Sequence, residues 1–136
     1  MKYFSFLMLF ITTTANANIY VVVNENSPIQ VSAVDEIADV YLGRRKSVGD
    51  TYIDQVLDRT GEDRRLFFEK VTNMRISQVN AYWAKLKFSG SMRAPEEVDS
   101  RQELLDKLAN NPQAIGYMRE APPEDSGLRV ALQIDE

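Results

Sequence analysis

The side chains that carry most enzymatic chemistry are missing from this chain. Its 136 residues include no histidine and no cysteine. Their absence removes the commonest general base, the thiol nucleophile and the usual ligands of zinc. Carboxylates remain, but no loop has the spacing of acidic side chains found in calcium sites. Because no nucleophile–base pair can be read from the sequence, we expect a protein that is not an enzyme and that holds no metal or cofactor.

The first side chains suited to binding lie in a polar loop, from residue 24 to residue 32. The β-branched run Ile19–Val23 before this loop predicts a strand covered on both faces, as in a parallel α/β sheet. Ligands of open α/β sheets sit beyond the carboxyl ends of the strands. The candidates for binding a small anion are therefore Asn24, Asn26, Ser27 and Ser32. Ordinary turn and helix-capping chemistry is the alternative interpretation of these residue types.

A second candidate pair precedes a predicted helix. Arg59 and Thr60 stand just before this helix, where they could face a ligand pocket. The alternative is that Arg59 forms surface ion pairs with the acidic residues around it, which contribute little. Those neighbours are Asp58, Glu62 and Asp63.

The densest basic cluster consists of Arg44, Arg45 and Lys46. It could receive an acidic partner or an oxyanion, because guanidinium groups bind such groups through charge-assisted hydrogen bonds. A solvated loop is the alternative, since basic residues are also favourable near the carboxyl end of a helix.

Predicted helices and strands alternate along the chain. Ser32 is a predicted N-cap, and Val34, Ile37, Ala38 and Tyr41 form the buried stripe of a helix that Gly43 ends. The other predicted helices span about 63–72, start near Ser77, and run from the capping box of Ser100 and Glu103 to Pro112. Residues 44–50 and 88–95 read as loops. Residues 51–57, 114–118 and 128–134 read as strands. This alternation predicts a three-layer α/β/α domain.

The amino terminus has the features of a secretory signal peptide. Met1 and Lys2 are followed by an apolar stretch and by Ala15-Asn16-Ala17, a small-residue cleavage site. We therefore expect residues 1–17 to be removed and residues 18–136 to form one exported, periplasmic domain. No later stretch reaches the roughly 20 apolar residues of a membrane span, so no membrane insertion is expected after cleavage. A formal net charge of −4 argues against a nucleic-acid partner.

Several short motifs, taken in order, resemble one family. They are Val21-Val-Val-Asn24, Val40-Tyr-Leu-Gly-Arg44, Ala81-Tyr-Trp83, Phe88-Ser-Gly90 and Pro112-Gln-Ala-Ile-Gly-Tyr117. This set is similar to the short phosphate ABC transporter substrate-binding-like proteins of the type 2 periplasmic binding protein superfamily. The chain departs from the family pattern at Gln113, where a glycine is usual. It also departs at Glu62 and Asp63, whose charges would oppose an anion at the helix that follows Arg59.

The resemblance implies a single lobe of a type 2 periplasmic binding protein. It implies a non-catalytic solute-binding protein that captures phosphate or a related oxyanion and serves a membrane transporter. The alternative is a periplasmic interaction or sensory domain that keeps the fold without binding phosphate and contacts a membrane transporter or sensor protein.

Overall fold

The computed structural model describes residues 18–89 and 94–135. The predicted signal peptide, residues 1–17, and residues 90–93 of the predicted loop 88–95 lie outside this part of the chain. The helices are α1 (Val34–Tyr41), α2 (Gly61–Thr72), α3 (Ile76–Ser89) and α4 (Arg101–Ala109). The strands are β1 (Ile19–Asn24), β2 (Ser47–Val48), β3 (Thr51–Tyr52), β4 (Gln55–Asp58), β5 (Glu96–Glu97), β6 (Ala114–Met118) and β7 (Leu128–Ile134). Within the described ranges, no helix is long and apolar enough to cross a membrane.

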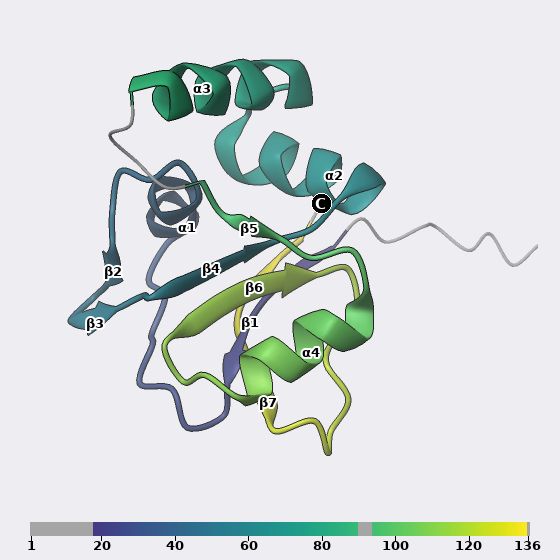
Figure 1. Ribbon diagram of the computed structural model, residues 1–136. Coiled ribbons are helices and arrows are strands. Elements are labelled where there is room, and N and C mark those ends of the chain that lie inside the picture. The colour runs from purple at the N-terminus through teal and green to yellow at the C-terminus, as the bar shows by residue number, and fades with distance from the viewer. Residues whose placement is uncertain (1–17, 90–93, 136) are drawn as a thin grey trace, which may run out of the picture.

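Five strands form the main sheet in the order β5-β4-β6-β1-β7. Strand β4 is parallel to both β5 and β6, whereas β1 is antiparallel to β6 and to β7. The arrows of β4 and β6 therefore point to the same edge of the sheet, and α2 and α4 begin at that edge (Figure 1). We call it the carboxyl edge, and the opposite edge, where β4 and β6 begin, the amino edge.

The predicted strand at Ile19–Val23 is confirmed, but its expected parallel pairing is wrong. Residues 21–24 of β1 are all buried, as a strand with helices on both faces requires. Burial on both faces does not fix strand direction, because a central antiparallel strand is equally apolar. Since β1 runs against β4 and β6, the loop after β1 lies at the amino edge of the sheet.

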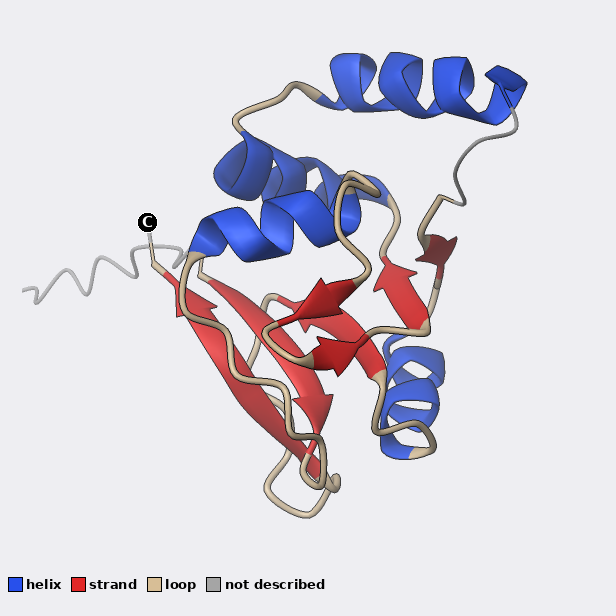
Figure 2. Cartoon of the chain, turned by 90° about the vertical axis from the view of Figure 1, so that its left-hand side faces the viewer, coloured by secondary structure: helices blue, strands red, loops and turns tan. Residues whose placement is uncertain are grey.

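The sheet separates two layers of helices, so the predicted three-layer α/β/α lobe is confirmed. Helices α1, α2 and α3 contribute to one core cluster with Val21, Val23 and Tyr117. Helix α4 forms the other cluster, in which Leu104 and Leu108 pack with Val22 and Leu57. Alternate residues of β1 thus point into different layers. Figure 2 shows helices on both sides of the strands.

Gly116 shows how closely α4 approaches the sheet. A Cβ atom built at this position would lie 2.9 Å from Cδ1 of Leu104 and 3.3 Å from Cδ1 of Leu108. Such distances are shorter than ordinary van der Waals contacts. The glycine in the Pro112–Tyr117 motif therefore allows two leucines of α4 to pack directly on β6.

Helix α1 has the predicted stripe but begins later than expected. Ile37 and Tyr41 are buried, and Gly43 adopts the left-handed conformation (φ 71°) just after the helix. The predicted N-cap Ser32 is wrong, because the helix is capped at Ala33. The carboxylate of Glu36 accepts hydrogen bonds from the backbone N–H groups of Ser32 and Ala33 at 2.7 and 3.2 Å.

The chain between α1 and α2 holds more strand than predicted. The expected loop 44–50 contains strand β2, which pairs with β3 as a short hairpin around Gly49 (φ 57°). The expected strand 51–57 is divided into β3 and β4. Gly49 and Asp50 form the turn, a common pairing in tight hairpins.

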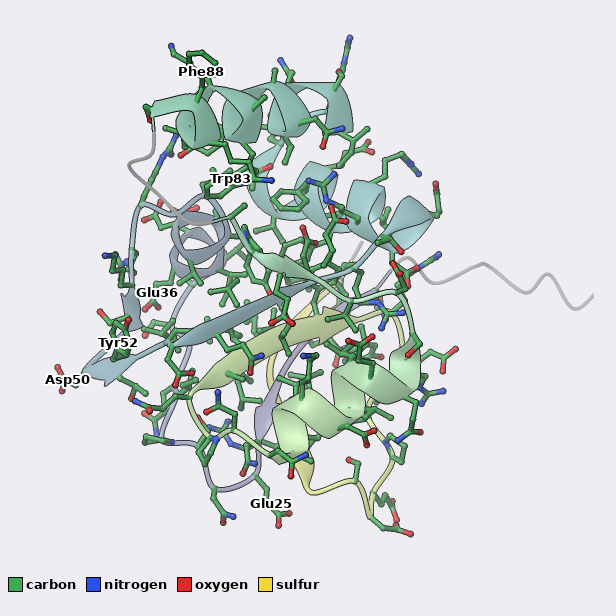
Figure 3. The ribbon with its side chains drawn as sticks, viewed as in Figure 1. Glu25, Glu36, Asp50, Tyr52, Trp83 and Phe88 are labelled. Carbon is green, nitrogen blue, oxygen red and sulfur yellow. The ribbon has the colours of Figure 1, made fainter. Side chains whose placement is uncertain are left out.

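The last two helices confirm one predicted cap and refute another. Ser100 Oγ accepts a hydrogen bond of 3.1 Å from the N–H of Glu103 at the start of α4. Ser77, by contrast, lies inside α3, and so do Phe88 and Ser89 of the predicted loop. Trp83 lies on the inner side of α3 and Phe88 on its outer side (Figure 3).

Candidate functional site

A hollow of about 360 Å³ opens at the carboxyl edge, where β4 and β6 end. Its volume is within the range of small-ligand sites. Three arginines line it together with two acids and one methionine. They are Arg59, Asp63, Arg101, Met118, Arg119 and Glu120. The lining carries one more positive than negative charge, so this carboxyl-edge hollow suits an anionic ligand.

Beneath the hollow, a buried carboxylate joins β4, β6 and α2. Asp58 is only 2 % exposed. Its Oδ1 accepts hydrogen bonds from the hydroxyl of Tyr117 at 2.5 Å and from the N–H of Arg59 at 2.8 Å. Its Oδ2 accepts one of 3.0 Å from Nε of Arg64 in α2. These contacts fix the backbone of Arg59 and hold α2 against the ends of both strands.

Burial sets the protonation behaviour of this network. Desolvation raises the pKa of the Asp58 carboxyl, against the hydrogen bonds from Tyr117, Arg59 and Arg64, which favour the charged form. Desolvation and the neighbouring Asp58 charge likewise raise the pKa of the Tyr117 hydroxyl. Tyr117 therefore stays protonated and acts as a hydrogen-bond donor.

Aromatic packing fixes Tyr117 from the side of the helices. Its ring stacks on Phe67 of α2, with centroids 3.6 Å apart and an interplanar angle of 3°. The ring of Tyr41 contacts both of these rings edge-on. The Tyr41 hydroxyl donates to the carbonyl of Leu57 at 2.8 Å, which ties α1 to β4. The ends of β4 and β6 next to the hollow are thus held by contacts with the two helices α1 and α2.

Asp63 lies between two of the arginines that line the hollow. Its carboxylate oxygens are 4.0 Å from Arg59 and 3.8 Å from Arg119. Both distances exceed those of a hydrogen-bonded ion pair. The Nε of Arg119 is buried and has no hydrogen-bond partner within the described residues. Arg59 Nη1 donates to the carbonyl of Ser100 at 3.3 Å. Both guanidinium groups line the hollow and carry further N–H groups without a hydrogen bond inside the described part of the chain.

The first turn of α2 adds backbone donors to the same edge. Thr60 is the N-cap but its side chain makes no capping hydrogen bond. Free N–H groups and the helix dipole at such an end favour anions. Of the two acids that are expected to oppose an anion here, only Asp63 lines the hollow. Glu62 does not line the hollow, and its carboxylate is hydrogen-bonded to Arg65.

The structure does not bring all of the predicted binding residues together. Arg59 and Thr60 lie at the carboxyl edge. Asn24, Asn26, Ser27 and Ser32 belong to the loop at the amino edge, about 17 Å away along the six-residue strand β1. The two groups cannot share one small ligand, because the expected parallel direction of β1 is wrong.

Structural contacts occupy the two buried members of the amino-edge loop. Asn24 Nδ2 donates to the carbonyls of Leu108 and Ala109 at 3.1 and 2.9 Å, and so caps the end of α4. Ser27 Oγ accepts a hydrogen bond of 3.2 Å from the N–H of Ile29. Capping and turn chemistry thus accounts for these two side chains.

The basic cluster 44–46 also lies at the amino edge, after α1. Arg45 is 3.6 Å from Glu36 and 3.9 Å from Asp39, at the outer limit of ion pairing. The backbone N–H groups of Arg44 and Arg45 donate to the carbonyl of Asp39, at 2.8 and 3.3 Å. The cluster therefore ends helix α1 and does not contribute to the carboxyl-edge hollow.

The sequence alone did not point to Arg101, Arg119 or Glu120. Arg119 directly follows β6, as Arg59 directly follows β4, and residues after neighbouring parallel strands meet at one edge. An arginine directly after each of two strands could have predicted that Arg59 and Arg119 meet, if the pairing of β4 with β6 had been known. Arg101 approaches only because α4 packs across the sheet.

Comparison with known proteins gives similarity of structure without similarity of sequence. No family model matches the chain, and no curated protein matches it significantly. A solved structure from Clostridium perfringens, assigned as a phosphate ABC transporter substrate-binding protein with bound phosphate, matches with a TM-score of 0.61 and 19% identity. The match covers 83% of this chain and 43% of that one.

Two further solved structures agree. An ABC-type phosphate transport receptor from Vibrio cholerae matches with a TM-score of 0.59 and 16% identity, over 83% of this chain and 44% of that one. PstS from Borrelia burgdorferi matches with a TM-score of 0.50 and 17% identity, over 77% of this chain and 42% of that one. The chain thus spans less than half the length of each.

These matches define the class of fold. The chain has the fold of a single lobe of a periplasmic binding protein. The predicted resemblance to phosphate ABC transporter substrate-binding proteins is confirmed at the level of the fold.

Proposed function

We propose that the protein is an exported, non-catalytic solute-binding lobe that captures phosphate or a related small oxyanion in the carboxyl-edge hollow. The observation that carries the proposal is the convergence of Arg59, Arg101 and Arg119 on one hollow beside the N-terminus of α2. Arginine binds tetrahedral oxyanions through paired N–H groups, and a helix N-terminus adds backbone donors.

The fold similarity supports the same proposal. One of the solved structures with this fold was determined with bound phosphate. A single lobe covers a ligand from one side only, so the affinity of this chain alone is expected to be modest. In this proposal the protein works in the periplasm after signal-peptide removal and passes its ligand to a membrane transporter.

The test is isothermal titration of the chain Asn18–Glu136 with inorganic phosphate at low ionic strength, with sulfate in a parallel series. We expect saturable heat with phosphate and a loss of affinity of about tenfold or more in Arg59→Ala and in Arg119→Ala, because each loses charge-assisted hydrogen bonds. Arg75→Ala is the matched control, since Arg75 is an exposed arginine just before α3 and should leave binding unchanged.

Circular dichroism must show that each variant is folded. Absence of heat from either anion with folded protein would refute the proposal. Phosphate binding of unchanged affinity in both arginine variants would place the anion elsewhere and refute the assigned site.

The second candidate is a periplasmic interaction or sensory domain with the same fold. The observation in its favour is that acidic residues already approach the arginines of the hollow. Arg101 lies 3.2 Å from Glu120, and Asp63 lies near Arg59 and Arg119. A protein that binds a partner but neither phosphate nor sulfate would support this candidate.

A further inference from the structure

Strand β7 is the last strand at one end of the main sheet, next to β1. In Figure 2 it is the outer strand that ends at the carboxyl terminus, marked C. Its seven residues pair only with β1. On the other side of β7, no strand, turn or loop of the described residues forms a backbone hydrogen bond with it. The outer side of β7 is therefore an open strand edge.

The hydrogen bond at the start of the β1–β7 ladder shows which peptide groups face this open edge. The N–H of Glu25 donates to the carbonyl of Gly127 at 2.9 Å. Successive peptide groups of a strand point to opposite sides, so the N–H groups of Leu128 and Val130 point away from β1. The register shift of the ladder comes only after Val130. The open edge thus presents hydrogen-bond donors to an added strand.

The side chains that usually protect an open edge are missing from β7. Natural edge strands carry lysine, proline or a protruding charge, which prevents pairing with another chain. The sequence of β7, Leu-Arg-Val-Ala-Leu-Gln-Ile, has no proline and a single charged residue. This residue, Arg129, donates from Nη2 to the carbonyls of Ser27 and Ile29 at 2.8 and 2.5 Å. Its charge is therefore held against a loop of the same chain and does not block the edge.

The side chains along the edge favour a second copy of β7 as the partner. Val130 is 38 % exposed, and Ala131, Leu132 and Ile134 are only partly buried. A second β7 covers this apolar surface with the same residue types and opposes no like charges. Since the Arg129 guanidinium is already bound, no free charge at the edge selects an acidic or a basic segment instead.

From these observations we propose that the open edge of β7 is a dimer interface, at which a second copy of the chain adds its own β7 in antiparallel orientation. The two main sheets join into one, held by main-chain hydrogen bonds between the β7 strands. Strands related by a twofold axis in this way use up both open edges, so the assembly closes as a dimer.

The direction of β7 decides where the two carboxyl-edge hollows lie in this dimer. Strand β7 is antiparallel to β1, which is antiparallel to β6, so β7 and β6 run toward the same edge of the sheet. The twofold axis reverses this direction in the second copy. The two hollows therefore open at opposite edges of the joined sheet, and neither copy covers the hollow of the other. The proposal does not depend on oxyanion binding.

The test is sedimentation velocity of the chain Asn18–Glu136 over a range of protein concentrations. We expect reversible dimerisation with a dissociation constant on the order of 10–100 µM, because the contact is only one strand wide. Val130→Lys puts a positive charge on each paired strand and should weaken the dimer at least about tenfold. Tyr52→Lys is the matched control, since it adds the same charge at a largely exposed residue of the β2–β3 hairpin and should dimerise as the unsubstituted chain does.

Amide hydrogen exchange of the ¹⁵N-labelled, unsubstituted chain locates the contact, and it tests the proposal even if Val130→Lys fails to fold. The N–H groups of Leu128 and Val130 should exchange more slowly as the protein concentration rises, because they gain acceptors in the dimer. A monomer at every concentration up to about 1 mM would overturn the proposal. So would a dimer that leaves these two amides unchanged, or one that Tyr52→Lys weakens as much as folded Val130→Lys does.

Discussion

The hydroxyl of Tyr117 donates a 2.5 Å hydrogen bond to the carboxylate of Asp58, and both side chains are buried at the end of adjacent parallel strands. Through this contact β6 holds the group that fixes the backbone of Arg59. The candidate anion site thus rests on a buried polar pair rather than on surface charges alone.

Replacing Tyr117 by phenylalanine removes the donor and keeps the ring that stacks on Phe67. We expect a loss of about 1–3 kcal/mol in the free energy of unfolding, because the buried Asp58 oxygen loses a partner. Urea unfolding measures the change. Tyr52→Phe is the control, since this hydroxyl belongs to a largely exposed residue. Equal stability of Tyr117→Phe and the unsubstituted chain would contradict the role of the bond.

Asp58 should make stability depend on pH. Its raised pKa means that the folded chain keeps a proton that the unfolded chain releases above its ordinary pKa of 3.8. The unfolding free energy contributed by Asp58 therefore falls as the pH rises from 3.8 to the raised pKa, and is constant above it.

The Asp58→Asn variant tests this sign. Urea unfolding at a series of pH values should show that the decrease of stability attributable to Asp58 is absent from the variant. The variant should also be less stable at neutral pH, because Arg64 loses its buried partner. Asp50→Asn, in the exposed hairpin turn, should keep the pH profile of the unsubstituted chain. If Asp58→Asn shows the same dependence of stability on pH as the unsubstituted chain, Asp58 does not titrate in this range.

Asp63 is expected to weaken anion binding in the carboxyl-edge hollow. Its carboxylate lies between Arg59 and Arg119, so Asp63→Asn removes a like charge a few ångströms from the ligand. We expect phosphate to bind about tenfold more tightly, measured by titration calorimetry at low ionic strength. Glu62→Gln is the control, since Glu62 contacts Arg65 and does not line the hollow. Unchanged phosphate affinity in Asp63→Asn would contradict the expectation that the Asp63 carboxylate repels the bound anion.

The cap of α4 should contribute to stability. Ser100→Ala removes the oxygen that accepts the Glu103 N–H, and we expect a loss of about 0.5–2 kcal/mol in the free energy of unfolding. Ser77→Ala is the natural comparison, because Ser77 lies inside α3 and caps nothing. Alanine is the better helix former, so this variant should unfold at the same or a higher urea concentration. A larger loss from Ser77→Ala than from Ser100→Ala would contradict the observed helix starts.

Periodicity in the sequence predicted the elements whose burial is simple. The stripe of Ile37 and Tyr41 follows from the side-chain spacing of a helix. Residues 128–134 form the predicted strand, but their burial does not alternate as expected, since Val130 is exposed next to a register shift in the pairing of β7 with β1. The N-cap Ser100 was recognisable because its acceptor and the Glu103 donor lie three residues apart; of the predicted capping box, the structure shows the Ser100 hydrogen bond. Ser32 and Ser77 have the right residue type for a cap, but neither caps a helix. At the start of α1 the Glu36 carboxylate accepts the backbone N–H groups instead, and α3 begins before Ser77.

The sequence by itself therefore determined the layer structure of the protein and much of its core. Only the tertiary structure decided the direction of β1, because an apolar run is the same whichever way the strand points. That direction separates Asn24 and Ser27 from Arg59 and assigns them to opposite edges of the sheet. The tertiary structure also brings Arg101 and Arg119 beside Arg59. These residues are far apart in sequence and meet only where β4, β6 and α4 come together.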